Sequence, residues 1–107
     1  LWEISKKATL PRLPWADMSS TFPGQTKPSG AALFIRPDHP DYPPTWLTRC
    51  YGPLCVGWPG VQPQTLPADR PIRASYRLWI HRGAADVVGI QTAYDGYVAA
   101  TQVAWDL

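Results

Sequence analysis

The fold class is decided by one stretch, Ile72-Arg-Ala-Ser-Tyr-Arg-Leu-Trp-Ile-His81, which alternates strictly between two kinds of side chain. Successive side chains of a β-strand point to opposite faces, so this period of two predicts a half-buried antiparallel strand, ended by Gly83. The residues expected on the core face are Ile72, Ala74, Tyr76, Leu78 and Ile80.

Further elements follow outward from this strand. Ala31–Ile35 is a short apolar run stopped by proline, which favours a buried strand, and Trp46–Tyr51 with Leu54–Trp58 predicts one or two strands. A short strand is also expected at Trp2–Ser5, within a proline-punctuated arm that disfavours long elements. Apolar residues recur at helical spacing over Ala85–Ala99. The sequence therefore predicts a mainly β protein, an antiparallel β-sandwich or jelly-roll-like fold with one C-terminal α-helix.

Composition sets the domain organisation. The chain has 107 residues, 13 prolines and 8 glycines, with 45% hydrophobic residues, which describes a folded, loop-rich protein rather than a disordered one. Its length predicts a single domain over residues 1–107. Because the sequence starts at Leu1 rather than methionine, we expect a processed protein, or the C-terminal portion or a subunit of a larger β-sandwich protein.

Charge and hydropathy exclude two classes of partner. The formal charge is +2 and Lys6-Lys7 is the only basic doublet, so the chain lacks the basic surface that nucleic acid requires. No apolar run approaches the roughly 20 residues of a membrane span, and no signal-peptide layout is present at the N-terminus. We expect a soluble protein, with the periplasm and the cell exterior as candidate locations that the sequence does not decide between.

Cys50 and Cys55 are the only cysteines, too few for a disulfide framework or a zinc site. They flank a plausible tight turn, so a small-loop disulfide and two half-buried thiols remain alternatives. With two histidines in the whole chain, a three-histidine metal site is impossible, and the sequence specifies neither a metal nor a cofactor.

The predicted site is the proline-rich stretch Asp38–Pro53. His39 lies between Asp38 and Asp41, a spacing suited to a general base oriented by a carboxylate or to a His-plus-carboxylate metal site. The two aspartates also suit the paired carboxylates of a glycoside hydrolase. The alternatives are structural: a hydrogen-bonded loop histidine, and Asx turns that cap the loop.

Aromatic residues in this stretch favour a sugar ligand. The chain has six tryptophans, and pyranose rings stack on flat indoles while their polar edges hydrogen-bond to charged groups. Tryptophan also builds the core of small domains, and Arg49 is either a substrate clamp or a salt-bridge partner of the loop aspartates. The expected substrate-binding residues are Trp46, Arg49, Tyr51, Tyr42 and His81.

A second cluster, Arg77, Trp79 and His81, lies on the strand face opposite the expected core. On a convex surface these are ordinary exposed residues; on a concave one they combine a cation, a stacking surface and an acid/base group. The two histidines share a substrate or metal only if they approach within about 8 Å of each other.

Several short segments share their order and spacing with a known family. They are Trp15 with Asp17, Gly30–Ile35, Asp38-His39-Pro40, Pro44-Thr-Trp46, Arg49–Pro53, Thr65–Ala68 and Tyr76–Gly83, followed by Tyr94 and Tyr97. This pattern resembles the C-terminal part of the PmoA-like family over about residues 12 to 100, with departures at Asp41, Tyr42 and Cys50. The resemblance implies a β-sandwich and a link to carbohydrate metabolism.

The sequence thus predicts a carbohydrate-active protein with hydrolase or lyase chemistry on a glycoside. His39 is the expected acid/base group, Asp41 and Asp38 its supporting carboxylates, Arg49 the clamp and Trp46 the stacking platform. The alternative is a non-catalytic carbohydrate-binding or structural module of a larger assembly. The expected partners are a carbohydrate ligand and further segments of a longer chain or another subunit.

Overall fold

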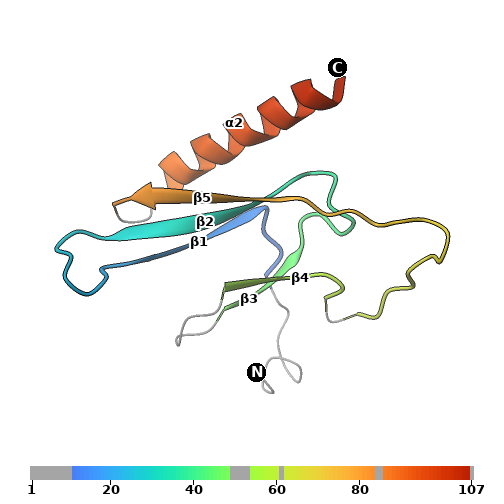
Figure 1. Ribbon diagram of the computed structural model, residues 1–107, viewed down its shortest axis with the longest axis horizontal. Helices are drawn as coiled ribbons and strands as arrows, with labels where there is room; N and C mark the ends of the chain where they lie inside the picture. Colours follow the sequence, from blue (N-terminus) through green and yellow to red (C-terminus); the bar gives the residue numbers. More distant parts are fainter. Residues whose placement is uncertain (1–10, 49–53, 61, 84–85, 107) are drawn as a thin grey trace.

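The computed structural model describes residues 11–48, 54–60, 62–83 and 86–106. Within them the strands are β1 (Trp15–Ser20), β2 (Ser29–Ile35), β3 (Thr45–Thr48), β4 (Leu54–Gly57) and β5 (Tyr76–Arg82), and the helix is α2 (Val87–Asp106). The strands form a three-stranded antiparallel sheet in the order β1-β2-β5 and a two-stranded antiparallel sheet, β3-β4. The described chain is mainly antiparallel β with one C-terminal helix, as predicted (Figure 1).

The predicted elements that fall within the described residues were confirmed with shifted ends. The expected strand Ala31–Ile35 is β2, the expected pair around residues 46–58 is the β3–β4 hairpin, and the expected helix begins at Val87 and extends to Asp106. The predicted strand Trp2–Ser5 lies outside the described residues. β1 was not predicted, because the prolines around it suggested an irregular arm; it forms where residues 15–20 are free of proline.

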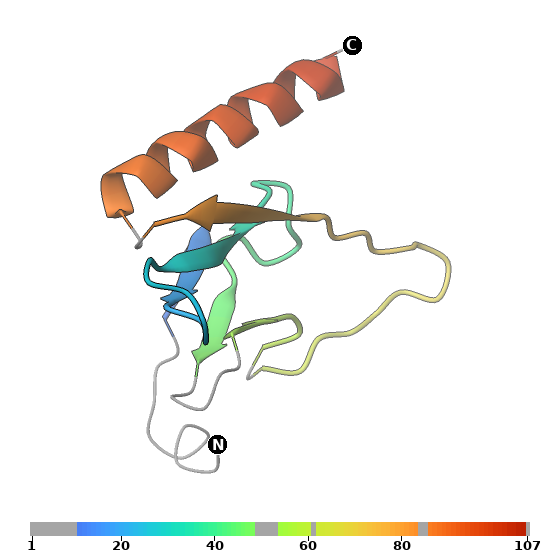
Figure 2. The ribbon, with the colours of Figure 1, turned by 60° about the vertical axis from the view of Figure 1, so that its left-hand side comes forward.

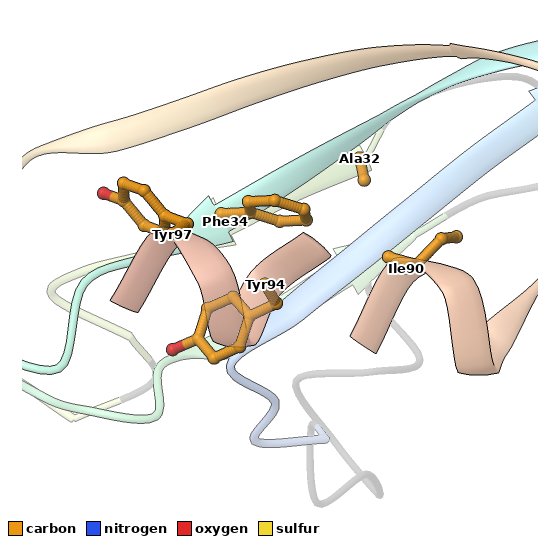
Figure 3. Packing of buried hydrophobic residues seen from close by; sticks show 5 residues of the cluster. All are labelled: Ala32, Phe34, Ile90, Tyr94 and Tyr97. Atoms are coloured by element: carbon orange, nitrogen blue, oxygen red, sulfur yellow. The ribbon is translucent and has the colours of Figure 1, made fainter. Parts of the chain in front are cut away.

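α2 covers one face of the three-stranded sheet. The core between them consists of Ala32 and Phe34 from β2 and Ile90, Tyr94 and Tyr97 from α2 (Figure 3). The Phe34 ring meets Tyr94 edge-on at 5.5 Å between centroids and Tyr97 at 5.8 Å. Such aromatic contacts add about 0.5–1.5 kcal/mol each to the area that they bury.

The face assigned to β5 from the sequence was wrong. Leu78 and Ile80, expected in the core, are 61% and 73% exposed, whereas Trp79 packs against the core beneath α2. Alternation shows that a strand has two different faces, but the covered one depends on what packs there. Here the aromatic residues of α2 complement Phe34 and Trp79, so the helix covers the face that carries Arg77, Trp79 and His81. Residues 72–75 precede the strand and are exposed.

The β3–β4 hairpin lies on the other side of the three-stranded sheet from α2, as the two views of the ribbon show (Figures 1 and 2). Trp46 of β3 is buried, and Ile35 at the end of β2 is fully buried although it points away from the helix-covered core. Two hydrogen bonds, Leu13 N to Pro44 O and Trp46 N to Pro11 O, tie the chain before β1 to β3. The hairpin thus encloses a second, smaller buried region.

Cys55 of β4 is an exposed free thiol. Because Cys55 is free, the disulfide alternative is wrong for this structure, and because Cys55 is exposed, the half-buried thiol expected as the other alternative is not found at this residue either. Cys50 lies outside the described residues.

Candidate active site

His39, the predicted acid/base group, is buried and hydrogen-bonded through both ring nitrogens. It is 5% exposed, and its Nδ1 accepts a hydrogen bond from the backbone N–H of Asp41 at 3.1 Å. In the neutral ring the proton is then on Nε2, which donates to the Tyr76 hydroxyl at 3.1 Å. Burial lowers the pKa of His39, and the nearby Asp41 and Asp38 offset this only in part. In the neutral ring both nitrogens therefore have hydrogen-bond partners within the fold, and the acid/base role of His39 stays a prediction.

The two predicted carboxylates form ion pairs. Asp41 accepts a two-pronged hydrogen bond from Arg12, at 2.6 and 3.1 Å, and Asp38 lies 3.3 Å from Arg36 Nε. The Asp41–Arg12 pair links the loop to the chain before β1, across 29 positions of sequence. These arginines differ from both structural alternatives predicted for the aspartates, Asx turns and a salt bridge to Arg49: the carboxylates brace the loop through Arg12 and Arg36.

Trp46, the residue predicted as the stacking platform for a sugar, is closed to ligands. Trp46 is 2% exposed and its indole N–H donates to Leu13 O at 2.8 Å, so no face of the ring is open to a sugar. The Tyr42 hydroxyl bonds that of Tyr94 at 2.7 Å. Arg49 and Tyr51, the other predicted binding residues of the loop, lie outside the described residues.

His81 lies in a different environment and is paired with Asp17. Its Nε2 is 2.5 Å from Asp17 Oδ1, and the two side chains are only 8% and 5% exposed. The second oxygen of Asp17 accepts a 2.6 Å hydrogen bond from the Ser19 hydroxyl. A buried carboxylate that holds one histidine nitrogen fixes the tautomer and the orientation of the ring. We call these three residues the His81 triplet.

Strand register brings the His81 triplet together. Ser19 of β1 and His81 of β5 both pair with Gly30 of β2, so Ser19, Gly30 and His81 lie in one row across the sheet. Asp17 is two residues before Ser19 on β1 and therefore lies on the same face. A Cβ atom on Gly30 would lie 2.5 Å from the Ser19 hydroxyl oxygen, a distance that no side chain tolerates. Glycine at this position therefore leaves the space in which Ser19 and Asp17 approach His81.

A cavity of about 210 Å³ opens beside the His81 triplet at the start of α2. Asp86 caps the helix there by accepting a hydrogen bond from Val88 N at 3.2 Å. The Trp79 ring lies between Phe34, at 5.9 Å, and His81, at 5.2 Å between centroids. The residues that line the cavity are Trp79, His81, Arg82, Asp86, Gly89 and Ile90.

The remaining nitrogen of His81 gives the cavity its chemistry. In a neutral ring whose Nε2 donates to Asp17, Nδ1 has a lone pair, and among the described residues no hydrogen bond to that nitrogen is present. A neutral imidazole held by a carboxylate is suited to act as a general base. Within the described chain, no group of three His, Cys, Asp or Glu side chains is arranged to hold a metal ion.

The two histidines do not share a site. His39 bonds to Tyr76 at the start of β5, and His81 is near the end of that strand. Five residues of strand separate these positions by about 16 Å, and an odd separation puts them on opposite faces. The predicted loop site and the predicted second cluster are thus two separate places.

Three hydrogen-bonding partners in these clusters were not predicted: Arg12, Asp17 and Ser19. They lie before β2, and Arg12 and Asp17 are far in sequence from Asp41 and His81, to which they bond. The resemblance to a Trp-x-Asp segment at Trp15 and Asp17 was the one available signal for this region.

These features define a small β-rich domain with a C-terminal helix and a buried His–Asp pair beside a polar cavity. Comparison with protein families gives the family: the model described as a family of unknown function (DUF6807) matches residues 3–95, and the chain belongs to it. The searches of curated proteins and of solved structures each found no match. The PmoA-like resemblance is not addressed by these comparisons and stays a prediction. None of the described helices is both long and apolar enough to cross a membrane.

Proposed function

We propose that this chain is a carbohydrate-active domain that carries out hydrolase or lyase chemistry at the cavity beside His81. The observation that supports it is the buried His81–Asp17 pair, since a histidine with one nitrogen held by a carboxylate and the other unbonded within the described chain is arranged for proton transfer. The acid/base role predicted for His39 passes to His81, because both nitrogens of His39 are used structurally.

The cavity suits a small polar substrate. Its volume of about 210 Å³ is below the roughly 300–1,000 Å³ of pockets for drug-sized ligands, so it fits about one sugar ring. Arg82 and Asp86 supply hydrogen-bonding groups of both charges for hydroxyls, and Trp79 and Ile90 supply an apolar wall. A cation and a carboxylate beside an apolar wall are a combination suited to the hydroxyl and C–H groups of a sugar.

In the proposed reaction, His81 Nδ1 accepts a proton, either from a water that attacks the glycosidic carbon in a hydrolysis or from a substrate carbon in a lyase elimination. The glycosidic C–O bond breaks, and the imidazolium returns the proton to the departing oxygen. The imidazolium that forms is stabilised by Asp17, and Ser19 fixes the carboxylate through its hydroxyl. Arg82 is exposed and stands beside the cavity, where its guanidinium can offset negative charge that develops on the substrate.

Asp17→Asn is the sharpest test, because it keeps the shape of the side chain and changes one hydrogen bond. The asparagine oxygen retains the bond from Ser19, so its NH₂ group faces His81 Nε2 and forces that nitrogen to accept. The ring proton then moves to Nδ1, and the general base is lost. Nitrogen NMR shifts of the His81 ring report this change of tautomer without any substrate.

The enzymatic readout is turnover of a panel of glycosides, together with sugar binding measured by saturation-transfer NMR. We expect Asp17→Asn and His81→Gln to lower turnover by about 10²–10⁴-fold with sugar binding retained. His39→Gln serves as the control histidine and should affect stability rather than turnover. Unchanged turnover in Asp17→Asn, with the tautomer shown to have moved, refutes the role of His81.

The second candidate is a non-catalytic carbohydrate-binding or structural module of a larger assembly. It is favoured by the two ion-paired loop aspartates and by the exposed apolar side chains Leu78 and Ile80. For the wild-type protein it predicts no turnover of any glycoside in the panel. A carbohydrate-binding module binds a sugar in the NMR experiment, and a purely structural module binds none. The carbohydrate ligand is common to the enzyme and to the binding module, so turnover separates them.

A further inference from the structure

One face of the three-stranded sheet carries exposed apolar side chains. On the side away from α2, Met18, Leu78 and Ile80 come from the two edge strands and are 38%, 61% and 73% exposed. Phe22, in the loop after β1, is 53% exposed. We call the surface formed by these four residues the open face. Contiguous apolar surface of this kind marks an interaction site in folded proteins.

A hollow in the open face has almost no polar lining. It measures about 370 Å³, and its lining combines the apolar residues Met18, Phe22, Ala31 and Ile80 with Ser19, Ser20, Ser29 and Gly30. A small polar ligand finds few groups there to orient it. Apolar side chains from a packed layer of protein need no such groups, so the hollow suits them.

The other end of the same face is already covered by β-structure. Ile35 belongs to this face and is fully buried, and Tyr76, which pairs with it, is bonded to His39. His39 in turn packs edge-on against Trp58, which follows β4, at 6.4 Å between ring centroids. The β3–β4 hairpin, which lies on this side of the sheet (Figures 1 and 2), and the proline loop therefore cover the Ile35 end, and the open face begins farther along β5 at Leu78 and Ile80.

We propose that further β-strands, carried on the same polypeptide outside residues 1–107, extend the β3–β4 sheet across the open face. Two packed sheets lie about 10 Å apart with interdigitating apolar side chains, and β3–β4 is already the first part of such a second layer. Two strands of four residues make a marginal sheet by themselves, so added strands also stabilise the hairpin. The added strands present apolar residues at every second position, toward Leu78, Ile80 and the hollow.

The size of the open face favours a tethered cover over a separate subunit. With whole side chains of about 150–250 Å² each, its four residues expose on the order of 400–500 Å². Stable association of separate chains takes about 800 Å² from each partner. A cover on the same polypeptide does not lose the translational freedom that separate chains lose, so this smaller area is enough.

The test is thiol labelling of the complete natural polypeptide. Cys50 and Cys55 are replaced by serine, and one cysteine is introduced as Ile80→Cys or, in the control, Val88→Cys. These positions match well: both residues are β-branched, and they are 73% and 75% exposed, on the open face and on α2 respectively. Maleimide reaction rates are measured at about 1 µM protein in native buffer and in guanidinium chloride, with folding checked by near-UV circular dichroism.

We expect the thiol of the Ile80→Cys variant to react at least about 100-fold more slowly in native buffer than in guanidinium, and that of Val88→Cys to stay within about tenfold of its unfolded rate. Leu78→Cys replaces Ile80→Cys if the latter fails to fold. A rate for the Ile80→Cys thiol within about tenfold of its unfolded rate overturns the proposal, as does a natural polypeptide that ends at these 107 residues. Protection that disappears on dilution, with the mass by light scattering falling by half, also overturns it and assigns the open face to a second copy of the chain.

Discussion

The hydroxyl of Tyr94 joins the helix, the sheet and the proline loop, and removing that one oxygen atom gives a precise test of how the domain holds together. Tyr94 Oη donates to the Ile35 carbonyl at 2.7 Å, so in its 2.7 Å bond with Tyr42 the proton comes from Tyr42. Burial raises the pKa of Tyr94, so this hydroxyl stays a protonated donor across the working pH range.

Removing the hydroxyl group from Tyr94 and from Tyr42 should lower the free energy of unfolding by unequal amounts. Tyr94→Phe removes the donor to a buried carbonyl next to the core, which costs about 1–3 kcal/mol. Tyr42→Phe leaves the Tyr94–Ile35 bond intact, and because Tyr42 is 38% exposed, water can reach the vacated position, so the loss is below about 1 kcal/mol.

Urea unfolding followed by far-UV circular dichroism measures both variants against the wild type, with equal m-values required for the comparison. The double variant should cost about as much as Tyr94→Phe alone, because the Tyr42 bond is lost with the Tyr94 oxygen. A loss for Tyr42→Phe equal to or larger than that for Tyr94→Phe refutes this assignment of donors and acceptors.

Three further predictions concern stability. Burial lowers the pKa of His39 below its ordinary value of 6.5, so the unfolded chain binds more protons as pH falls through 6.5. The free energy of unfolding should therefore decline as pH falls below about 7, by at most about 1.4 kcal/mol per pH unit, and urea titrations of His39→Gln should show a flatter profile. Phe34→Ala should cost about 3–5 kcal/mol in the same assay, since the ring is 1% exposed among aromatic neighbours, and a loss under about 1 kcal/mol contradicts the core described. Gly30→Ala should destabilise by about 1–3 kcal/mol because its methyl group meets the backbone carbonyl of Met18 and the Ser19 hydroxyl, each at 2.5 Å. Gly96→Ala, whose methyl group meets nothing within 4 Å, should instead stabilise α2 by about 0.5–1 kcal/mol, and thermal melts of the pair check the opposite signs.

The elements that the sequence predicted well are those whose signal is local. β2 is a short apolar run bounded by breakers, and α2 repeats its apolar residues at about 3.6-residue spacing, so each is specified by neighbours within a few positions. β1 was missed because the prolines before and after it dominated the local signal. The proline-free segment itself, Trp15–Ser20, is long enough to pair with all six residues Ser29–Phe34.

The orientation of β5 and the chemistry of the histidines are not local properties. The bonds that decide them join positions far apart in sequence: 37 residues for His39 and Tyr76, and 64 for Asp17 and His81. A sequence pattern identifies a histidine with carboxylates nearby, as it did for His39. It does not show whether both nitrogens are used within the fold, and that is what separates His39 from His81.

The hydroxyl of Tyr76 connects the structural histidine with the open face. It accepts the Nε2 proton of His39, so its own proton needs an acceptor elsewhere, and the residue is now 42% exposed to water. Burial raises the pKa of Tyr76, which keeps that proton on the oxygen. If strands extend the β3–β4 sheet toward β5, they come close to this hydroxyl, and a buried donor left without an acceptor would cost about 1–3 kcal/mol. The covering layer should therefore be apolar over Leu78 and Ile80 but offer a carbonyl or polar side chain opposite Tyr76, which distinguishes a matched second sheet from unspecific hydrophobic contact.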